Sequence, residues 1–341
     1  MLVCYHRSSS LGTLEFCQQK YFLQYNLSFK DKTNKKALMG TITHKVMQTL
    51  GDKKVAMNKG LDIVDDDETG RQLTLAECDD IKLLNDIAFD YYTSAFPEVN
   101  ITEADRRTCL RWAEKALAYN HGDLDPRNQD VYATELFFDI EIKKPWAKYK
   151  YEVGDEVLEG YLSIKGTVDL IVTRGENYFE ILDYKTGKRL NWATGEEKTI
   201  ECLEKDTQLL LYYYALRSMY PDYEFFVSIY YINDGGLFSM CFDDDDFQKA
   251  EDILRKKFEQ IKSCQYPRLL SNQNSHSKCQ KLCKFSEPSE QDPSRSVCQF
   301  IRDEIRTKGI TEVVQEYGNV SKIAKYGDGG GRLAEDEEDK K

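Results

Sequence analysis

The order of apolar and polar positions along the chain predicts strands that alternate with helices. Val131 to Ile142 and Val157 to Ile164 alternate as half-buried strands do, whereas Asp206 to Tyr220 repeats apolar residues at helical spacing. Glu224 to Ile232 and Leu237 to Phe242 predict a hairpin, because an Asn-Asp-Gly-Gly turn separates them. This order indicates an α/β or α+β architecture with a mixed sheet.

A charged hairpin is predicted at the centre of this pattern, over residues 166–189, where two apolar runs flank an Arg-Gly-Glu-Asn turn. Asp183 and Lys185 share one face, because side chains alternate along a strand. A loop of three or five residues would place Asp169 directly opposite Asp183, on the side away from the Tyr184 ring. Two carboxylates beside an ammonium suit a hard divalent cation such as Mg²⁺, and a charged edge hairpin with a surface ion pair explains the same residues equally well.

Two helices are predicted in the first fifty residues. The first covers Leu11 to Asn26, with Ser10 as its N-cap and Cys17 in its middle. The second places Gly40 and His44 on one face. A lone helical histidine is more often structural than functional, but a glycine one turn earlier would allow a backbone or a ligand to approach it closely.

Two further polar positions are candidates for the same chemistry. Gln208 and Tyr212 lie four residues apart on one helical face, where they could hold a phosphate or position a lysine; the alternative is a buried tyrosine with an ordinary polar neighbour. Glu135 could be a third acid near the hairpin, although an exposed strand residue is the simpler interpretation.

Composition narrows the class of protein. The net charge of −12 argues against a general nucleic-acid coat protein, because phosphate contacts need lysine and arginine; basic stretches could still bind nucleic acid locally. No apolar run approaches the roughly 18 to 20 residues that span a bilayer, and the N-terminus lacks the zones of a signal peptide, so we expect a cytoplasmic protein without a membrane partner.

The cysteines predict a metal centre near the C-terminus. Ten cysteines in a reducing compartment are an improbable disulfide framework. Cys279, Cys283 and Cys298 lie in a proline-containing loop with little apolar content, which would need a cross-link, and Cys17 is the candidate fourth ligand. Zinc fits four thiolates as well as an iron–sulfur cluster does.

The pattern divides the chain into five segments. These are N-terminal helices (1–50), a helical insertion lobe (51–130), a core of strands and helices (131–265), a cysteine-rich segment (266–325) and a disordered acidic tail (326–341). The insertion carries no recognisable chemistry and could serve as a clamp or lid. The glycine-rich and then highly charged composition of the tail predicts its disorder.

Six motifs occur in one order along the chain: Ser9-x-Leu11 with Cys17 and Tyr21, Gly40-x₃-His44, Gly166-x₂-Asp169, Asp183-Tyr-Lys-Thr-Gly187, Gln208-x₃-Tyr212 and the late cysteine trio. This ordered set resembles the RecB-type branch of the PD-(D/E)XK nucleases, which includes the CRISPR-associated RecB-like exonucleases and the AddB nuclease. The chain departs from the usual pattern at Gln18, where the family has proline, and in the wider spacing of its late cysteines.

The resemblance implies an α/β fold with a PD-(D/E)XK restriction-endonuclease-like core, in which helices flank a mixed central β-sheet, and a helical insertion. It also implies roles for individual residues. Mg²⁺ or Mn²⁺ would be held by His44, Asp169, Asp183 and the Tyr184 carbonyl, Lys185 would be catalytic, Gln208 and Tyr212 would lie around the DNA phosphate, and Cys17, Cys279, Cys283 and Cys298 would hold a [4Fe–4S] cluster.

The expected function is therefore a metal-dependent DNA nuclease, more specifically an exonuclease, in DNA repair, recombination or phage DNA metabolism. It would act in the cytoplasm, which is the host's if the protein is phage-encoded. The alternative is a DNA-binding, nuclease-like subunit of a larger helicase or CRISPR-adaptation-type assembly. The sequence contains no Gly-x₄-Gly-Lys-[Ser/Thr] phosphate loop, so any unwinding would come from a separate motor protein.

Overall fold

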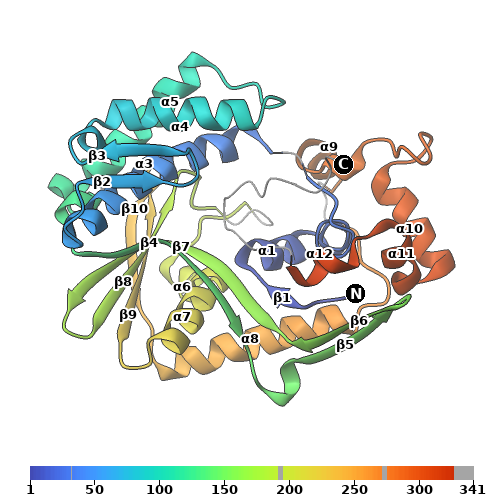
Figure 1. Cartoon of the computed structure of the whole chain (residues 1–341). Helices are drawn as coiled ribbons and strands as arrows, with labels where there is room; N and C mark the ends of the chain where they lie inside the picture. Colours follow the sequence, from blue (N-terminus) through green and yellow to red (C-terminus); the bar gives the residue numbers. More distant parts are fainter. Residues whose placement is uncertain (32, 191–194, 271–274, 326–341) are drawn as a thin grey trace.

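The computed structural model describes residues 1–31, 33–190, 195–270 and 275–325; the predicted disordered tail lies outside these residues. Its central sheet is mixed and six-stranded, with β1, β7, β8, β9 and β10 in spatial order and β4 paired to β7 (Figure 1). The strands are β1 (Tyr5–His6), β4 (Val131–Glu141), β7 (Ser163–Gly175), β8 (Tyr178–Lys185), β9 (Glu224–Tyr231) and β10 (Gly236–Cys241).

Strands β7 and β8 form the predicted hairpin. Leu170 pairs with Leu182 and Thr173 with Phe179, and a register shift follows Thr173. Five residues therefore lie between Thr173 and Phe179, which are the last regular pair. Continuing this register by one residue from Leu170 places Asp169 opposite Asp183, as predicted. The hairpin is therefore confirmed, and its register from Leu170 to Thr173 is the one that would bring Asp169 opposite Asp183.

Helices cover both faces of the central sheet. Because β8 and β9 are parallel, the chain needs a crossover between them, and α7 (Thr207–Met219) provides it within the predicted helical range. The following helix α8 (Asp244–Lys262) packs beside α7, while α3 (Lys35–Asn58) lies on the opposite face (Figure 1). Along β8, Leu182 packs on the α3 side and Ile181 on the α7 side. The predicted α/β fold with a mixed sheet flanked by helices is confirmed.

The first predicted helix is interrupted. Helix α1 (Ser8–Phe16) ends before Cys17, whose extended backbone (φ −162°, ψ 117°) separates it from α2 (Gln18–Tyr21) and a π-helical turn, Phe22–Asn26. Cys17 is therefore at a break rather than in the middle of a helix, and the N-cap is Arg7 rather than Ser10. Ser10 instead accepts a hydrogen bond from the Arg7 N–H from inside the first turn, which is a contact that apolar periodicity does not reveal.

Residues 51–130 are not uniformly helical, so that expectation was wrong. Helix α3 continues to Asn58 and is followed by a hairpin of β2 (Ile63–Asp66) and β3 (Arg71–Thr74), with α4 (Ile81–Ala95) and α5 (Glu103–Leu117) after it. The acidic run that starts at Asp65 forms the tip of this hairpin. Each strand has only four residues. The hairpin is held by the buried apolar pair Val64 and Leu73 and by an ion pair, in which buried Lys45 Nζ lies 2.6 Å from Asp66 Oδ1. The division of the chain into separate lobes stays a prediction.

The cysteine-rich segment also differs from the expected loop. It contains α9 (Ser275–Leu282), α10 (Val297–Lys308), α11 (Ile310–Tyr317) and α12 (Val320–Lys325), and it buries Phe285, Phe300, Ile301 and Ile305 in the core that β1 and α1 also line. A few large apolar side chains thus supply packing that the low average apolar content concealed. A small sheet of β5 (Lys148–Val153) and β6 (Glu156–Tyr161) borders the same region (Figure 1).

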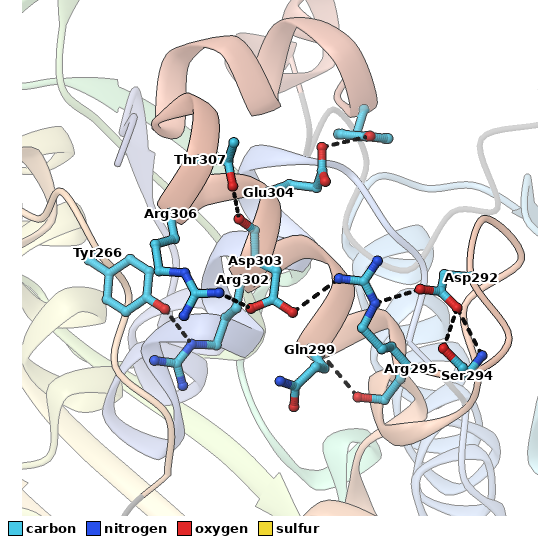
Figure 2. Close-up of polar contacts among 12 residues, drawn as sticks. Tyr266, Asp292, Ser294, Arg295, Gln299, Arg302, Asp303, Glu304, Arg306 and Thr307 are labelled. Carbon is cyan, nitrogen blue, oxygen red and sulfur yellow. Dashed lines mark hydrogen bonds and ion pairs between the residues drawn. The ribbon is translucent and has the colours of Figure 1, made fainter.

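A polar network fixes the start of α10 (Figure 2). Arg295 Nε donates to Asp292 and its Nη1 to Asp303, at 2.6 and 3.1 Å, while Arg302 Nε donates to the Tyr266 hydroxyl at 3.2 Å. Partly exposed ion pairs contribute on the order of 0 to 1 kcal/mol each, so their main effect here is orientation rather than stability. They hold the first turn of α10, which carries Cys298, against the chain that follows α8.

His6 on β1 is a pH-dependent element of the core. It is fully buried, and this burial, with a smaller contribution from the charge of Lys257, lowers its pKa to about 3. The neutral imidazole is therefore the form that fits the folded protein.

We expect stability to fall on acidification because of His6. A group whose folded pKa lies below its unfolded value of roughly 6.5 stabilises the protein fully above pH 6.5, and this contribution is lost as pH falls toward the folded value, by about 3 kcal/mol between pH 7 and pH 4.5. Urea unfolding at both pH values should show a smaller loss for His6→Gln than for the wild type. Equal losses in the two proteins would contradict the assignment.

Candidate active site

The candidate site lies where one edge of β7 has no strand partner. Strand β4 pairs with one edge of β7 from Ser163 to Val172, so β1 and β8 must share the other edge. On that edge β1 reaches only as far as Ile164, and β8 begins to pair at Leu170. Between these two points the edge of residues 165–169 is paired with neither β1 nor β8, and the sheet has an opening there. We call this opening the fork.

Asp169 lies at the end of the fork that β8 borders. Its Oδ2 accepts a hydrogen bond from the Tyr184 backbone N–H at 2.9 Å, so a carboxylate satisfies a donor that a regular ladder would have paired with a carbonyl. His44 Nδ1, on α3, is 3.4 Å from the same oxygen. The sheet and α3 therefore bring two of the predicted metal ligands together.

Asp183 is the most enclosed charged group of the site. Its side chain is 1% exposed, and its Oδ1 accepts hydrogen bonds from Lys185 Nζ at 2.9 Å and from Gln208 Nε2 at 3.0 Å. Burial raises its pKa to about 6, aided by the charge of Asp169 and opposed by Lys185. Burial alone would lower the pKa of Lys185, but the charges of Asp183 and Asp169 raise it, so the ammonium stays protonated at neutral pH.

Gln208 and Tyr212 on α7 complete this group of residues. Gln208 Nε2, which donates to Asp183, also donates to the Tyr212 hydroxyl at 2.7 Å, so Gln208 joins the two residues. Tyr212 is buried, and its ring packs edge-on against Phe138 of β4. The helix thereby fixes the position of the Asp183 carboxylate from the side opposite α3.

Close packing explains why glycine occurs at two of the motif positions, Gly40 and Gly166. A Cβ on Gly40 would come 3.0 Å from Thr186 Oγ1, so the glycine lets α3 approach the end of β8 closely. A Cβ on Gly166 would come 2.5 Å from the Phe138 ring, which lies over that strand position.

Glu135 is a residue of the site that sequence reasoning assigned to the surface. On β4, Thr134 pairs with Leu170 and Leu136 with Val168, so the intervening Glu135 lies opposite Asp169. Its backbone has φ +42°, a strained value for a residue other than glycine. Burial and the nearby Asp169 carboxylate raise its pKa to about 8. The signal that could have identified it is the register between the predicted strand at 131–142 and the motif strand.

Two cavities meet at Thr167, which lines both. One, of about 340 Å³, opens beside the fork and is lined by Arg7, Ser8, Ser9, Lys165, Gly166, Thr167, Gln208 and Tyr212. The other, of about 610 Å³, is rich in carboxylates: Asp52, Asp65, Asp66, Asp67, Glu68, Glu135 and Asp169 line it together with His44, Lys45 and Phe137. We call the second cavity the acidic cavity. The site therefore has one basic and hydroxyl-lined side and one acidic side.

The donor set fits a hard divalent cation. Across β4, β7 and β8, Glu135, Asp169 and Asp183 occupy adjacent strand positions, with His44 beside the middle one. Oδ2 of buried Asp183 accepts no hydrogen bond, although Lys185 Nζ lies 2.7 Å from it. Carboxylate oxygens are the ligands that Mg²⁺ and Mn²⁺ prefer, and the His44 imidazole could add a nitrogen ligand. Among the residues that the structure describes, no three acidic, histidine or cysteine side chains already stand as a closed metal-binding group.

The four predicted cluster cysteines lie near one another. All ten cysteines of the chain are free. Burial raises the pKa of Cys298 to about 12, with further contributions from Cys17, Cys283 and Cys279. Within the described ranges these thiols form no closed metal-binding group either. The four thiols therefore lie close enough to interact electrostatically, and the cluster stays a prediction.

Comparisons with known proteins agree with the fold. The model of the PD-(D/E)XK nuclease superfamily matches residues 8–287, a range that contains the whole fork but not Cys298. A solved structure of a presumed exonuclease from Eubacterium rectale is similar at 12% identity and a TM-score of 0.44, covering 78% of this chain and 84% of that one. The search of curated proteins returned no match. None of the helices in the described ranges is long and apolar enough to cross a membrane. With most of its length matched by the family model, the chain belongs to the PD-(D/E)XK nuclease superfamily.

Proposed function

We propose that this protein hydrolyses phosphodiester bonds of DNA at the fork, with a divalent cation as cofactor, as a member of the RecB-type branch. The observation that carries the proposal is the placement of Asp169 and Asp183 on adjacent strand positions with Lys185 beside them. A structural ion pair with Lys185 would need only one carboxylate. Here the Asp169 carboxylate is placed next to the buried carboxylate of Asp183. Such crowding of like charges raises the free energy of the cation-free protein and favours cation binding.

In this proposal, Mg²⁺ or Mn²⁺ would be held by His44, Asp169, Asp183 and the Tyr184 carbonyl, with Glu135 within reach of the same ion. When bound, the cation would polarise the scissile phosphate and supply a water that is easily deprotonated. Glu135 is uncharged near neutral pH without the cation, because its pKa is raised to about 8, and it can gain charge as the cation binds.

The chain's own residues have defined tasks. Lys185 remains an ammonium and offsets negative charge that develops on the phosphate oxygens. Gln208 holds the Asp183 carboxylate through its side-chain amide, and Tyr212 accepts from the same amide, which fixes its orientation. Because Gln208 and Tyr212 also line the cavity beside the fork, they are placed to contact a phosphate there.

The unequal charge of the two cavities favours action at DNA ends. A strand that continued through the site would have to pass its phosphates along the carboxylates at the tip of the β2–β3 hairpin. Phosphates and carboxylates that share a partly dehydrated cavity repel each other strongly. A strand that ends at the site avoids this cost, so we propose an exonuclease.

Replacing Asp183 by Asn, or Lys185 by Ala, should abolish cleavage of end-labelled DNA in Mg²⁺ or Mn²⁺, because each change removes a charge on which the proposed chemistry depends. The expected loss is about 10³-fold or more. Lys188→Ala is the matched control, since Lys188 is an exposed lysine three residues away. Thermal unfolding should be cooperative in all three variants. Undiminished cleavage by either site variant would overturn the assignment, and DNA binding without cleavage by the wild type would favour the alternative of a binding subunit.

Linear DNA with both ends open should be degraded, while circular single- and double-stranded DNA of the same sequence should survive. The physical reason is the acidic side of the site, which disfavours a continuing strand. Blocking either end separately then identifies the end from which the enzyme starts. Cleavage of circular substrates at the rate of linear ones would contradict exonuclease action while leaving the nuclease assignment intact.

We further propose that Cys17, Cys279, Cys283 and Cys298 hold a [4Fe–4S] cluster, with zinc as the less favoured alternative. Its support is the electrostatic proximity of four thiols: Cys17 at the break after α1, Cys279 in α9, Cys283 directly after α9 and Cys298 in α10. A cluster there would join the N-terminal helices to the C-terminal segment and would have no part in cleavage.

Protein purified under argon should be brown and contain about four irons per chain. Cys298→Ser should lose the colour and lower the unfolding temperature, whereas Cys241→Ser, at an exposed cysteine of β10, should change neither. A colourless, stably folded preparation that carries zinc would decide against iron.

A further inference from the structure

We propose that Phe137 is a stacking platform for an unpaired base of the nucleic-acid substrate, so that the acidic cavity receives the base while the phosphate remains at the fork. This inference rests on the proposed nuclease function, because it assigns a substrate contact at the same site. Phe137 lies on β4 directly opposite Thr167 of β7, and two residues after Glu135. It lines the acidic cavity.

The surroundings of Phe137 distinguish it from other surface aromatics. Among the described residues, four aromatic side chains are more than a third exposed: Tyr132, Phe137, Tyr178 and Tyr266. Tyr132 packs on Phe179, Tyr178 lies against Phe226, and Arg302 lies over the Tyr266 ring. In the described part of the chain, Phe137 has no such ring or cation partner, and it belongs to none of the hydrophobic clusters.

The contrast with the next residue makes the same point. Phe138 points to the other side of the strand, where it is buried over Gly166 and against the Tyr212 ring. Packing therefore explains Phe138. Packing in the hydrophobic clusters does not account for Phe137, which is 38% exposed and lines a carboxylate-rich cavity beside the site.

The chemistry of the acidic cavity selects a base over a phosphate. Glu135, Asp169 and His44, which also line this cavity, are proposed cation ligands. The carboxylates of the β2–β3 hairpin are not: they repel phosphate groups, but they can accept hydrogen bonds from the amino groups of cytosine, adenine or guanine, and the Phe137 ring offers a face to any base. A volume of about 610 Å³ is within the range of sites that enclose one small organic ligand, here a single nucleoside.

This arrangement has a consequence for the substrate. A base can lie on Phe137 only if it has left its partner strand, so the cavity takes a nucleotide of a single-stranded or frayed end. The base would then anchor the nucleotide from one side of Thr167, and the residues beside the fork would hold the backbone from the other.

Binding without hydrolysis tests the proposal directly. Single-stranded oligonucleotides that carry 2-aminopurine at successive positions from each end are titrated with protein in EDTA, and fluorescence quenching reports stacking. Wild type and Phe137→Tyr should quench one end-proximal position. Phe137→Ala and Phe137→Leu should not, and should bind about 5- to 100-fold more weakly, the usual range for loss of one aromatic stacking contact. Tyr178→Ala is the matched control at 39% exposure and should behave as the wild type.

An abasic site at the quenched position provides a second measurement. It should weaken wild-type binding as much as Phe137→Ala does and should have no further effect on that variant, because both changes remove the same contact. Equal quenching in wild type and Phe137→Ala, or additive losses, would overturn the inference. Cleavage in Mg²⁺ is measured separately: if the wild type quenches but does not cut, the proposed function fails and the stacking contact stands, and if it cuts without quenching, only the stacking contact fails.

Discussion

The fork in the sheet is the constraint on which the site depends. A continuous ladder along β7 would satisfy every backbone group of residues 165–169 with another strand and would leave no room for polar side chains. Because β1 stops at Ile164 and β8 starts pairing at Leu170, the ladder is open between them, and the Asp169 carboxylate accepts the Tyr184 N–H on the β8 side of the opening. The interruption of the sheet is thus what converts a structural edge into a place where carboxylates can converge.

The elements around the fork have divided tasks. Helix α3 brings His44 through the close approach that Gly40 permits, and α7 brings Gln208 and Tyr212 from the opposite face. Each contact reaches one of two carboxylates whose positions the hairpin register has already fixed. The precision of the site therefore comes from the rigid sheet and two long helices, while the short acidic hairpin β2–β3 only borders it and is held by the buried Lys45–Asp66 ion pair.

Strand periodicity was enough to predict the β7–β8 hairpin, and helical spacing was enough to predict α7, while the residues proposed to act at the fork were identified by the order of the motifs and the family that they resemble. They failed where the deciding contact is with a residue far along the chain, and where a local break in the backbone interrupts a helix. Glu135 looked like a surface residue because its partner strand lies far along the chain, and Cys17 looked helical because apolar spacing continues across the break. The β2–β3 hairpin was missed because each strand has only four residues, and its few buried residues, Val64, Asp66 and Leu73, are held by contacts with α3, among them the ion pair of Asp66 with Lys45, twenty-one residues earlier.

The position of β1 also has a consequence for biosynthesis. Tyr5 and His6 are synthesised long before their partners on β7, which come only after residue 162, so this pairing has a high contact order and must wait. Gln208 and Tyr212 follow later still. A nascent chain therefore lacks the complete site until α7 has left the ribosome. The carboxylates would come together only when most of the surrounding core can already enclose them.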